Sequence, residues 1–240
     1  KSLWSIKYNY LFHIYFLIKK NITVANQRIQ KVYGGNIIYH GPIISNKKIS
    51  IYKFKSILKR EKPNQKNILF AGTPRNFKGI ELLIDTINNN ELKNFKLFTA
   101  GKNENNFYSN YKNSKKYNYL GLLNNTEIKE VMEFIDIIII PSEYNSFSEY
   151  QTPAKLLEAM AYKKIIITSN LPPMKEIIGN DNGVILENLN KETLSDLLLD
   201  INKNLNYYLN KAENAYIFYK EKASLEINSK KLSDILNEYK

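Results

Sequence analysis

The sequence predicts an α/β fold built on a doubly wound parallel sheet. From about residue 67 onward, short apolar runs alternate with longer mixed stretches, as strands alternate with crossover helices. One run, IDIIII (135–140), is apolar on both faces, which is typical of a central strand covered on both sides. Two other runs end in glycine, at Gly72 and Gly101, as expected where a strand passes into its loop.

The expected elements follow in order along the chain. Strands are predicted at NILFAG (67–72), FKLFTAG (95–101), YNYLG (117–121), IDIIII (135–140), KIIITS (164–169) and GVILE (183–187). Helices are predicted at 78–88, 125–134, 152–162 and 173–179, with two or three more after about residue 190. The Asn- and Lys-rich stretch 102–118 is expected to be a loop. Ligands of such sheets bind in the loops that follow the strands.

Residues 1–45 lie outside this alternation. A helix at about 4–20, a strand-like ITVAN (22–26), a short helix and NIIYHGPI (36–43) read as the tail of a preceding α/β domain, followed by a linker at about 40–50. We therefore expect a tail and interdomain linker at 1–45, the sheet domain at 46–220 and a C-terminal helix at 221–240.

The composition narrows the function classes. Hydrophobic content of 43% with charged content of 24% is that of a folded globular chain. The 35 basic residues exceed the 23 acidic ones, and the net charge of +12 attracts polyanions. The basic residues are spread along the chain without a dense cluster interleaved with aromatics, so we expect no nucleic-acid partner. A weak peripheral contact with an anionic membrane surface remains the expectation.

Cysteine and histidine content argues against covalent or metal crosslinks. With no cysteine, neither a disulfide nor a thiolate metal site can form, and the two histidines are too isolated to build a metal site. The apolar segment 3–20 is interrupted by polar residues and predicts an amphipathic helix rather than a membrane span. No signal peptide is visible, and a start at Lys1 rather than Met suggests a fragment or processed form.

A helix start lies shortly after the central strand. Thr152 is a good N-cap and Pro153 a good first helical residue, so the helix is expected to open there. Its first amide groups, with Lys155 beside them, would form an anion site above the sheet. The alternative is a well-capped helix without a ligand.

Glu158 lies in the apolar stretch LLEAMA (156–161), where a carboxylate without a partner is costly to bury. Two neighbouring ribose hydroxyls would satisfy it. The alternative is a partly exposed Glu158 paired with Lys155, three positions earlier. The residues alone leave both interpretations open.

The loop GTPRNFKG (72–79) follows the first strand of the sheet domain. Gly72 lets the backbone approach a ligand, and Arg75 and Lys78 are cations suited to a diphosphate. The pattern is neither a P-loop nor the dinucleotide-binding fingerprint, and solvated basic side chains are the alternative interpretation. Gly101 and Gly121 end later strands, and Gly121 is expected to serve only as a turn.

Several blocks occur in collinear order over about residues 67–187. They are FAGTPRNFKGIELLI, KLFTAGK, YLGLL, DIIIIPS, TPAKLLEAMA, KKIIITSNLPPMKEII and NGVILE. In order and spacing they resemble the C-terminal domain of glycosyltransferase family 4, and the upstream ITVANQRIQKVYGGNIIYHGPI is similar to the end of that family's N-terminal domain. The resemblance implies the Rossmann-like half of a GT-B fold.

The resemblance also implies a function. It implies a retaining glycosyltransferase with a UDP- or GDP-linked sugar donor, a glycan or lipid-linked acceptor held by the N-terminal domain, no cofactor and no active-site metal. Carried over residue by residue, the expected donor-binding set is Gly72, Arg75, Lys78, Gly101, Tyr119, Leu120, Thr152, Pro153, Lys155 and Glu158. In this set Arg75 and Lys78 would hold the diphosphate, Glu158 the ribose, and the backbone at 119–121 would flank the base.

One departure from the family pattern concerns the sugar contact. Members often carry two glutamates separated by seven residues, the second of which corresponds to Glu158. The first position is Tyr150 here, with Glu149 one residue earlier. That contact therefore stays unassigned between Glu149 and Tyr150, and no catalytic residue is assigned.

Two hypotheses of different classes stay open. The first is the donor-binding half of a glycosyltransferase, which is expected to bind nucleotide sugar yet turn over poorly alone because most of the acceptor domain is missing. The second is a non-catalytic accessory or nucleotide-sugar-binding module. An epimerase would need acid and base residues that the sequence does not reveal. The expected localisation is cytoplasmic, with peripheral contact at the inner face of the membrane.

Overall fold

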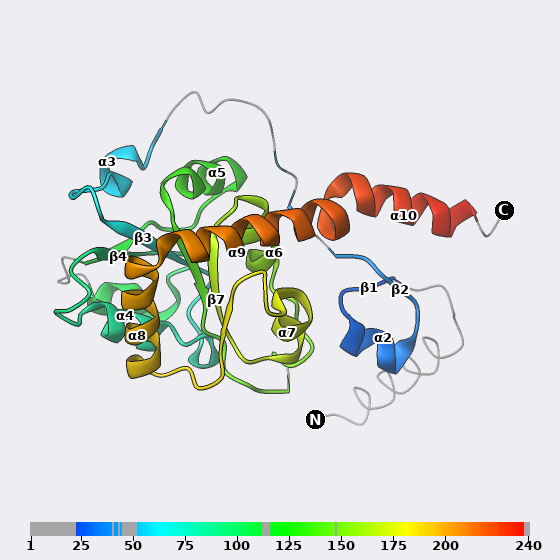
Figure 1. Ribbon diagram of the computed structural model, residues 1–240, viewed down its shortest axis with the longest axis horizontal. Coiled ribbons are helices and arrows are strands. Elements are labelled where there is room, and N and C mark those ends of the chain that lie inside the picture. Colours follow the sequence, from blue (N-terminus) through cyan, green and yellow to red (C-terminus); the bar gives the residue numbers. More distant parts are fainter. Residues whose placement is uncertain are drawn as a thin grey trace.

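The computed structural model describes residues 23–39, 41–42, 44, 52–111, 116–146 and 148–237 (Figure 1). The predicted helix at 4–20 and most of the predicted linker at 40–50 lie outside these residues. None of the helices within these ranges is long and apolar enough to cross a membrane.

The first described elements form a small unit of their own. β1 (Thr23–Val24) and β2 (Asn36–Ile37) pair in parallel as a separate two-stranded sheet, joined by α2 (Gln27–Tyr33). Figure 1 shows this unit at one end of the molecule, beside α7 and α10. The assignment of 1–45 to an acceptor domain stays a prediction.

The main sheet confirms the predicted fold class. Its six parallel strands are β3 (Lys66–Ala71), β4 (Phe95–Ala100), β5 (Tyr117–Tyr119), β6 (Ile137–Ile140), β7 (Ile165–Ser169) and β8 (Val184–Leu186). They lie in the order β5-β4-β3-β6-β7-β8, so the chain winds outward from β3 in one direction and then outward from β6 in the other. All six predicted strand segments overlap one of these strands. The strands of the sheet centre are buried on both faces, as the double apolar pattern of β6 indicated.

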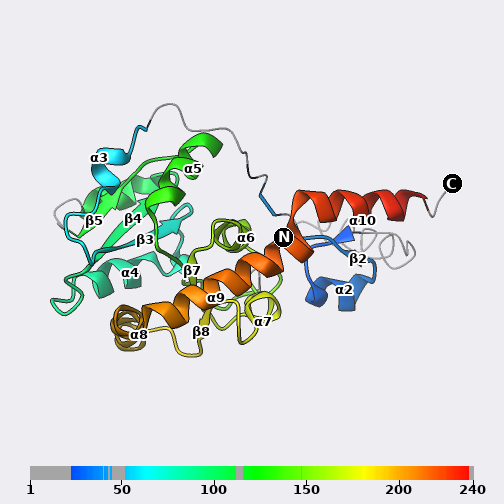
Figure 2. The same cartoon turned by 45° about the horizontal axis from the view of Figure 1, so that its top comes forward.

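Helices cover both faces of this sheet (Figures 1 and 2). On one side α4 (Ile80–Ile87) packs against α8 (Lys191–Lys203), and their apolar side chains share a core with alternate strand residues such as Ile137 and Ile139. On the other side lie α5 (Asn125–Phe134), α6 (Ala154–Ala161) and α7 (Pro172–Ile178), which share a second core with Ile138 and Ile140.

The C-terminal end continues from α9 (Leu205–Phe218) through a short π-helical segment (Tyr219–Ala223) into α10 (Leu225–Asn237). The C-terminal helix thus begins four residues later than the predicted 221. In Figure 2, α9 runs along the sheet domain and α10 extends beyond it, toward the β1–α2–β2 unit. The side-chain amide of Asn228 donates to the Tyr39 carbonyl, which joins α10 to the residues just after β2.

Several described elements were not predicted from the sequence, among them a 3-10 turn at Asn76–Lys78. α3 (Lys55–Leu58) precedes the sheet and packs near α5 through the buried Leu58. A 3-10 segment (Glu104–Tyr111) lies within the stretch expected to be a loop, and its Tyr108 is 1% exposed. The prediction of a loop is wrong there because buried aromatic side chains, absent from a solvated loop, hold this segment against the sheet.

Candidate functional site

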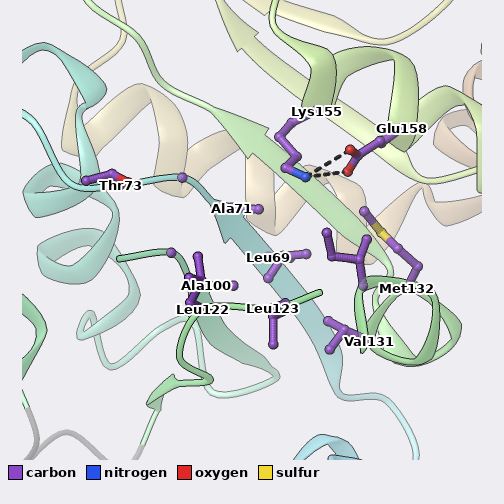
Figure 3. A pocket seen from close by; sticks show the side chains of 13 residues that line it. Leu69, Ala71, Thr73, Ala100, Leu122, Leu123, Val131, Met132, Lys155 and Glu158 are labelled. Atoms are coloured by element: carbon purple, nitrogen blue, oxygen red, sulfur yellow. Dashed lines mark hydrogen bonds and ion pairs between the residues drawn. The ribbon is translucent and has the colours of Figure 1, made fainter. Parts of the chain in front are cut away.

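A pocket opens at the carboxyl ends of β3 and β4, next to the point where the strand order reverses between β3 and β6. Ligands of doubly wound sheets bind at this position. The pocket has a volume of about 160 Å³ and is lined by Leu69, Ala71, Gly72, Thr73, Ala100, Gly101, Leu122, Leu123, Ile128, Val131, Met132, Lys155 and Glu158 (Figure 3). One wall is therefore apolar, formed by β3 and α5, while α6 contributes the charged groups.

Lys155 and Glu158 form the charged wall of the pocket. The Lys155 ammonium donates to both oxygens of the Glu158 carboxylate, at 2.9 and 2.7 Å. They lie three positions apart on α6, which matches the ion pair that the sequence left as one of two interpretations. Figure 3 shows both side chains on the same side of the pocket, with Ala71 and Met132 nearby. Side-chain exposures of 28% and 16% leave both groups accessible to a ligand.

The placement of this pair follows from the pattern of α6. Leu156, Leu157 and Met160 face the core, so the helix is anchored by its apolar side. Lys155 and Glu158 lie one turn apart on its other face and meet at the crevice. Burying the apolar face therefore orients the charged pair.

The glycine at the end of β4 is required by close packing of two loops. Gly101 has φ +149°, and a Cβ there would come within 2.2 Å of the Gly72 carbonyl oxygen. The Gly101 amide donates to the Gly121 carbonyl, so three strand-end loops lie in direct contact. Gly121 itself, with φ +86°, has no atom within 4 Å of a built Cβ, in agreement with a turn.

Two stacked tyrosines support these loops from below. The ring centroids of Tyr108 and Tyr119 are 4.3 Å apart, and the two rings are nearly parallel. The Tyr108 hydroxyl donates to the Gly72 carbonyl at 2.9 Å, and the Tyr119 hydroxyl donates to the Gly101 carbonyl at 2.6 Å. Burial raises the pKa of both phenols, which keeps them protonated as donors. Tyr119 thus shapes the pocket rim from the side away from the cavity.

The cations of the loop 72–79 lie beside the pocket and do not line it. Arg75 is exposed over a neighbouring depression that also contains Glu81 and Glu104. Lys78 is half-buried, and its burial, followed by the nearby Arg75 charge, lowers its pKa. Within the described ranges, neither cation is paired with a carboxylate at salt-bridge distance. An anion placed between them would relieve this repulsion.

The prediction that Thr152 caps α6 is wrong. The N-cap position is Pro153, with extended backbone and no side-chain cap, and the first helical residue is Ala154. The Thr152 hydroxyl instead donates to the Ala25 carbonyl at 3.3 Å and accepts from the side-chain amide of Asn26 at 3.1 Å. Long-range hydrogen bonds to the β1–α2 connection thus replace the local cap. Neither Thr152 nor Pro153 lines the pocket.

Glu149 and Tyr150 also point toward the β1–α2–β2 unit. The Glu149 carboxylate accepts from the Arg28 guanidinium and from the Tyr144 hydroxyl. The Tyr150 ring lies under the same guanidinium, with its centroid 4.7 Å from the guanidinium carbon. Neither side chain lines the pocket beside Glu158, so the structure does not bring the two candidate sugar contacts to that cavity.

Comparison with known proteins identifies the family to which the chain belongs. The family described as glycosyl transferases group 1 matches residues 53–218. The chain belongs to the group 1 glycosyltransferases. An uncharacterized glycosyltransferase of Methanocaldococcus jannaschii is 30% identical over 139 residues, which are 55% of this chain and 34% of that protein. The chain therefore spans about a third of the length of this curated relative.

Solved structures show the same fold. Sucrose-phosphate synthase of Thermosynechococcus elongatus superposes with a TM-score of 0.69 at 13% identity, over 94% of this chain and 60% of that one. Anabaena HepE in complex with UDP-glucose superposes with a TM-score of 0.70 at 16% identity, over 91% of this chain and 64% of that one. The group 1 glycosyltransferase chain thus has the α/β architecture of GT-B enzymes.

Four of the predicted residues line the pocket of this group 1 glycosyltransferase: Gly72, Gly101, Lys155 and Glu158. Tyr119 and Leu120, which were predicted to flank the base, do not line the pocket, whereas Leu122 and Leu123 do. Leu122 is 75% exposed, and both leucines follow the last residue of β5. The apolar wall of α5 was missed although its spacing of three and four residues was visible.

Proposed function

We propose that this chain supplies the donor-binding half of a retaining glycosyltransferase of the family 4 type. Its donor would be a UDP- or GDP-linked sugar, and its acceptor a glycan or a lipid-linked molecule. The proposal rests above all on the Lys155–Glu158 pair beside an apolar wall at the carboxyl ends of β3 and β4. A nucleoside needs both features, since its base is largely apolar on its faces and its ribose presents two hydroxyls.

The proposed donor orientation assigns each part of the nucleotide to a different wall. The base would lie against Leu122 and Leu123, and the ribose hydroxyls would donate to the Glu158 carboxylate. The diphosphate would extend toward the loop 72–79, where the cations Arg75 and Lys78 have no carboxylate partner among the described residues.

These cations also suit the chemistry of transfer. The bond between the anomeric carbon and the diphosphate oxygen breaks, a bond to an acceptor oxygen forms on the same face, and the proton of the acceptor hydroxyl passes to the departing diphosphate. Negative charge accumulates on the departing diphosphate. Fixed cations stabilise such charge most strongly where water is excluded. Arg75, Lys78 and Lys155 would supply this stabilisation without a metal ion or a cofactor.

A structural neighbour of this chain binds a donor of this class. Anabaena HepE was solved in complex with UDP-glucose, and it shares the fold with this chain. This supports a UDP-sugar as the first donor to test. The separate β1–β2 sheet supports our assignment of residues 1–45 to the tail of an acceptor-binding domain.

A specific observation favours a second candidate, a nucleotide-sugar-binding module without turnover. The Glu149 carboxylate is occupied by Arg28 and Tyr144, so the group nearest to the family's sugar-binding glutamate points elsewhere. The two candidates share the donor pocket and differ in whether the sugar is transferred.

The experiment titrates UDP, GDP, UDP-glucose and GDP-mannose into the protein by calorimetry and then assays release of the nucleoside diphosphate with lipid-linked and oligosaccharide acceptors. Saturable binding of one nucleotide series is expected. Release that depends on the acceptor, with a product of the donor's anomeric configuration by NMR, supports the retaining transferase. Binding without release by the chain joined to its complete acceptor domain supports the non-catalytic module. Absence of nucleotide binding would overturn both.

We also propose a cytoplasmic location with peripheral contact at the inner face of the membrane, supported by the net charge of +12. Sedimentation with vesicles containing about 30% phosphatidylglycerol, compared with neutral vesicles, tests it. Equal recovery with both vesicles would remove the membrane contact from the proposal.

A further inference from the structure

A buried asparagine joins the β1–α2 connection to the segment that enters α6. Asn26 is fully buried, and its side-chain amide donates to the Tyr150 carbonyl at 2.8 Å and to the Thr152 hydroxyl at 3.1 Å. The Thr152 hydroxyl donates in turn to the Ala25 carbonyl. These contacts join residues more than 120 positions apart in the sequence.

The same side chain also begins α2. The side-chain oxygen Oδ1 of Asn26 accepts from the Ile29 backbone amide at 2.9 Å, as an N-cap does. Its two polar ends therefore have separate tasks: the oxygen starts a helix of the first unit, and the nitrogen holds the segment 150–152. Because the side chain is buried, neither bond can be exchanged for water without cost.

A charged contact lies beside these hydrogen bonds, on the exposed side of the same connection. Arg28, in the first turn of α2, pairs with Glu149 and lies over the Tyr150 ring. Residues 149, 150 and 152 thus contact the β1–α2 unit through a side chain or a carbonyl, and the segment has little freedom to move relative to it.

The held segment leads directly to the charged wall of the pocket. Pro153 follows Thr152 with a fixed φ and occupies the N-cap position of α6. Lys155 lies in the first turn and Glu158 in the second. No side chain caps this helix locally, and the bonds of Asn26 hold the segment that enters it, in addition to the packing of its apolar face.

We propose that Asn26 is a positioning residue for the donor site: by holding residues 150–152 it sets the place of α6 and hence of Lys155 and Glu158 in the crevice. This inference rests on the proposed donor function for its consequence. Donor affinity in this chain then depends on the β1–α2–β2 unit, although that unit does not line the pocket.

The test uses a substitution that separates the two tasks of Asn26. Asn26→Asp keeps a good N-cap for α2 but removes the donor to Tyr150 and Thr152. Thr152→Val removes the bonds from Thr152 to Asn26 and Ala25 at nearly constant shape and leaves the bond from Asn26 to the Tyr150 carbonyl. Each variant should weaken UDP binding, measured by calorimetry on folded protein, by about three- to tenfold. In the double variant the two losses should be less than additive, because both substitutions remove the Asn26–Thr152 bond.

A matched control cuts a different contact of the same unit. The Tyr39 hydroxyl donates to Glu176 on α7 at 2.7 Å, and Tyr39→Phe removes this bond. We expect this variant to lose thermal stability as the others do, and to bind UDP with the affinity of the wild type. A readout without nucleotide is hydrogen exchange of peptides spanning 150–158, which should be faster in Asn26→Asp and unchanged in Tyr39→Phe.

The outcomes separate the inference from the proposed function. If Asn26→Asp and Thr152→Val lower only the melting temperature, with unchanged UDP affinity and unchanged exchange at 150–158, Asn26 has a merely structural role and the inference is wrong. If the wild type binds neither UDP nor GDP, the donor site is wrong, while the exchange comparison still decides whether Asn26 orders the entrance of α6.

Discussion

Glu158→Gln is the sharpest test of the donor site. The substitution keeps the shape of the side chain and removes its charge. In the free protein it weakens the ion pair with Lys155, whose nitrogen lies 2.9 and 2.7 Å from the two carboxylate oxygens. In the proposed complex it also weakens the bonds that the carboxylate would accept from two ribose hydroxyls.

The two effects differ in size. The ion pair is partly exposed and lies along one helix, so its loss should lower the free energy of unfolding by about 0.2–1 kcal/mol. A hydrogen bond to a charged group contributes about 1 kcal/mol more than a neutral one. For two ribose bonds the loss is about 1–3 kcal/mol, which corresponds to a rise of about 5- to 150-fold in the Kd of the donor.

The assay is calorimetric titration of UDP into both proteins, with thermal unfolding recorded in parallel. Glu213→Gln is the matched control, because Glu213 forms an exposed pair with Lys163 at 2.9 Å and does not line the pocket. It should leave UDP affinity unchanged. Wild-type affinity in folded Glu158→Gln, or an equal loss in Glu213→Gln, would refute the assignment of Glu158 to the ribose.

Three further outcomes follow from the loops around the pocket. Lys78→Met should weaken UDP binding about tenfold or more. Its melting temperature should equal or exceed that of the wild type, because burial and the Arg75 charge both lower the pKa of Lys78 and so disfavour its charged form in the fold. A drop in melting temperature with unchanged affinity would contradict this. A bound diphosphate would raise the lowered pKa of Lys78, so binding takes up a proton. UDP affinity should therefore fall as the pH rises through the lowered pKa toward 10.5, the ordinary lysine value. UDP titrations of Lys78→Met across this pH range should show no such fall. Gly101→Ala should lower the free energy of unfolding by about 2 kcal/mol or more, because the added Cβ would lie 2.2 Å from the Gly72 oxygen. Gly121→Ala, where no atom lies near the added Cβ, should lower it by about 1 kcal/mol. Equal denaturation midpoints of the two variants would show that the close approach is relaxed in solution.

The strands of the sheet domain could be predicted because their signal is local. In β6, apolar residues on both faces require cover on both sides, and the structure buries all of Ile137–Ile140. The ends were less accurate: the strand predicted at 117–121 ends at Tyr119. Strand ends depend on which backbone groups find partners in the neighbouring strand, and the sequence does not name that neighbour.

The predicted site residues line the pocket where local pattern and fold topology coincide. Lys155 and Glu158 lie on one helix at a spacing that brings them together, and the loop after a parallel strand lies at the crevice in every doubly wound sheet. Thr152 was placed wrongly for the opposite reason. Its residue type favours a helix cap, but Asn26, far away in the sequence, offers its hydroxyl a different partner.

By itself, then, the sequence determined the parallel α/β architecture, the order of its elements and the helix that carries Lys155 and Glu158. These follow from interactions between residues close in the chain, which apolar periodicity and spacing record directly. The tertiary structure alone decided that Thr152, Glu149 and Tyr150 face the β1–α2–β2 unit, and that leucines after β5 line the pocket. The partner of a polar side chain is selected by three-dimensional proximity, and that proximity exists only once the sheet and its helices have packed.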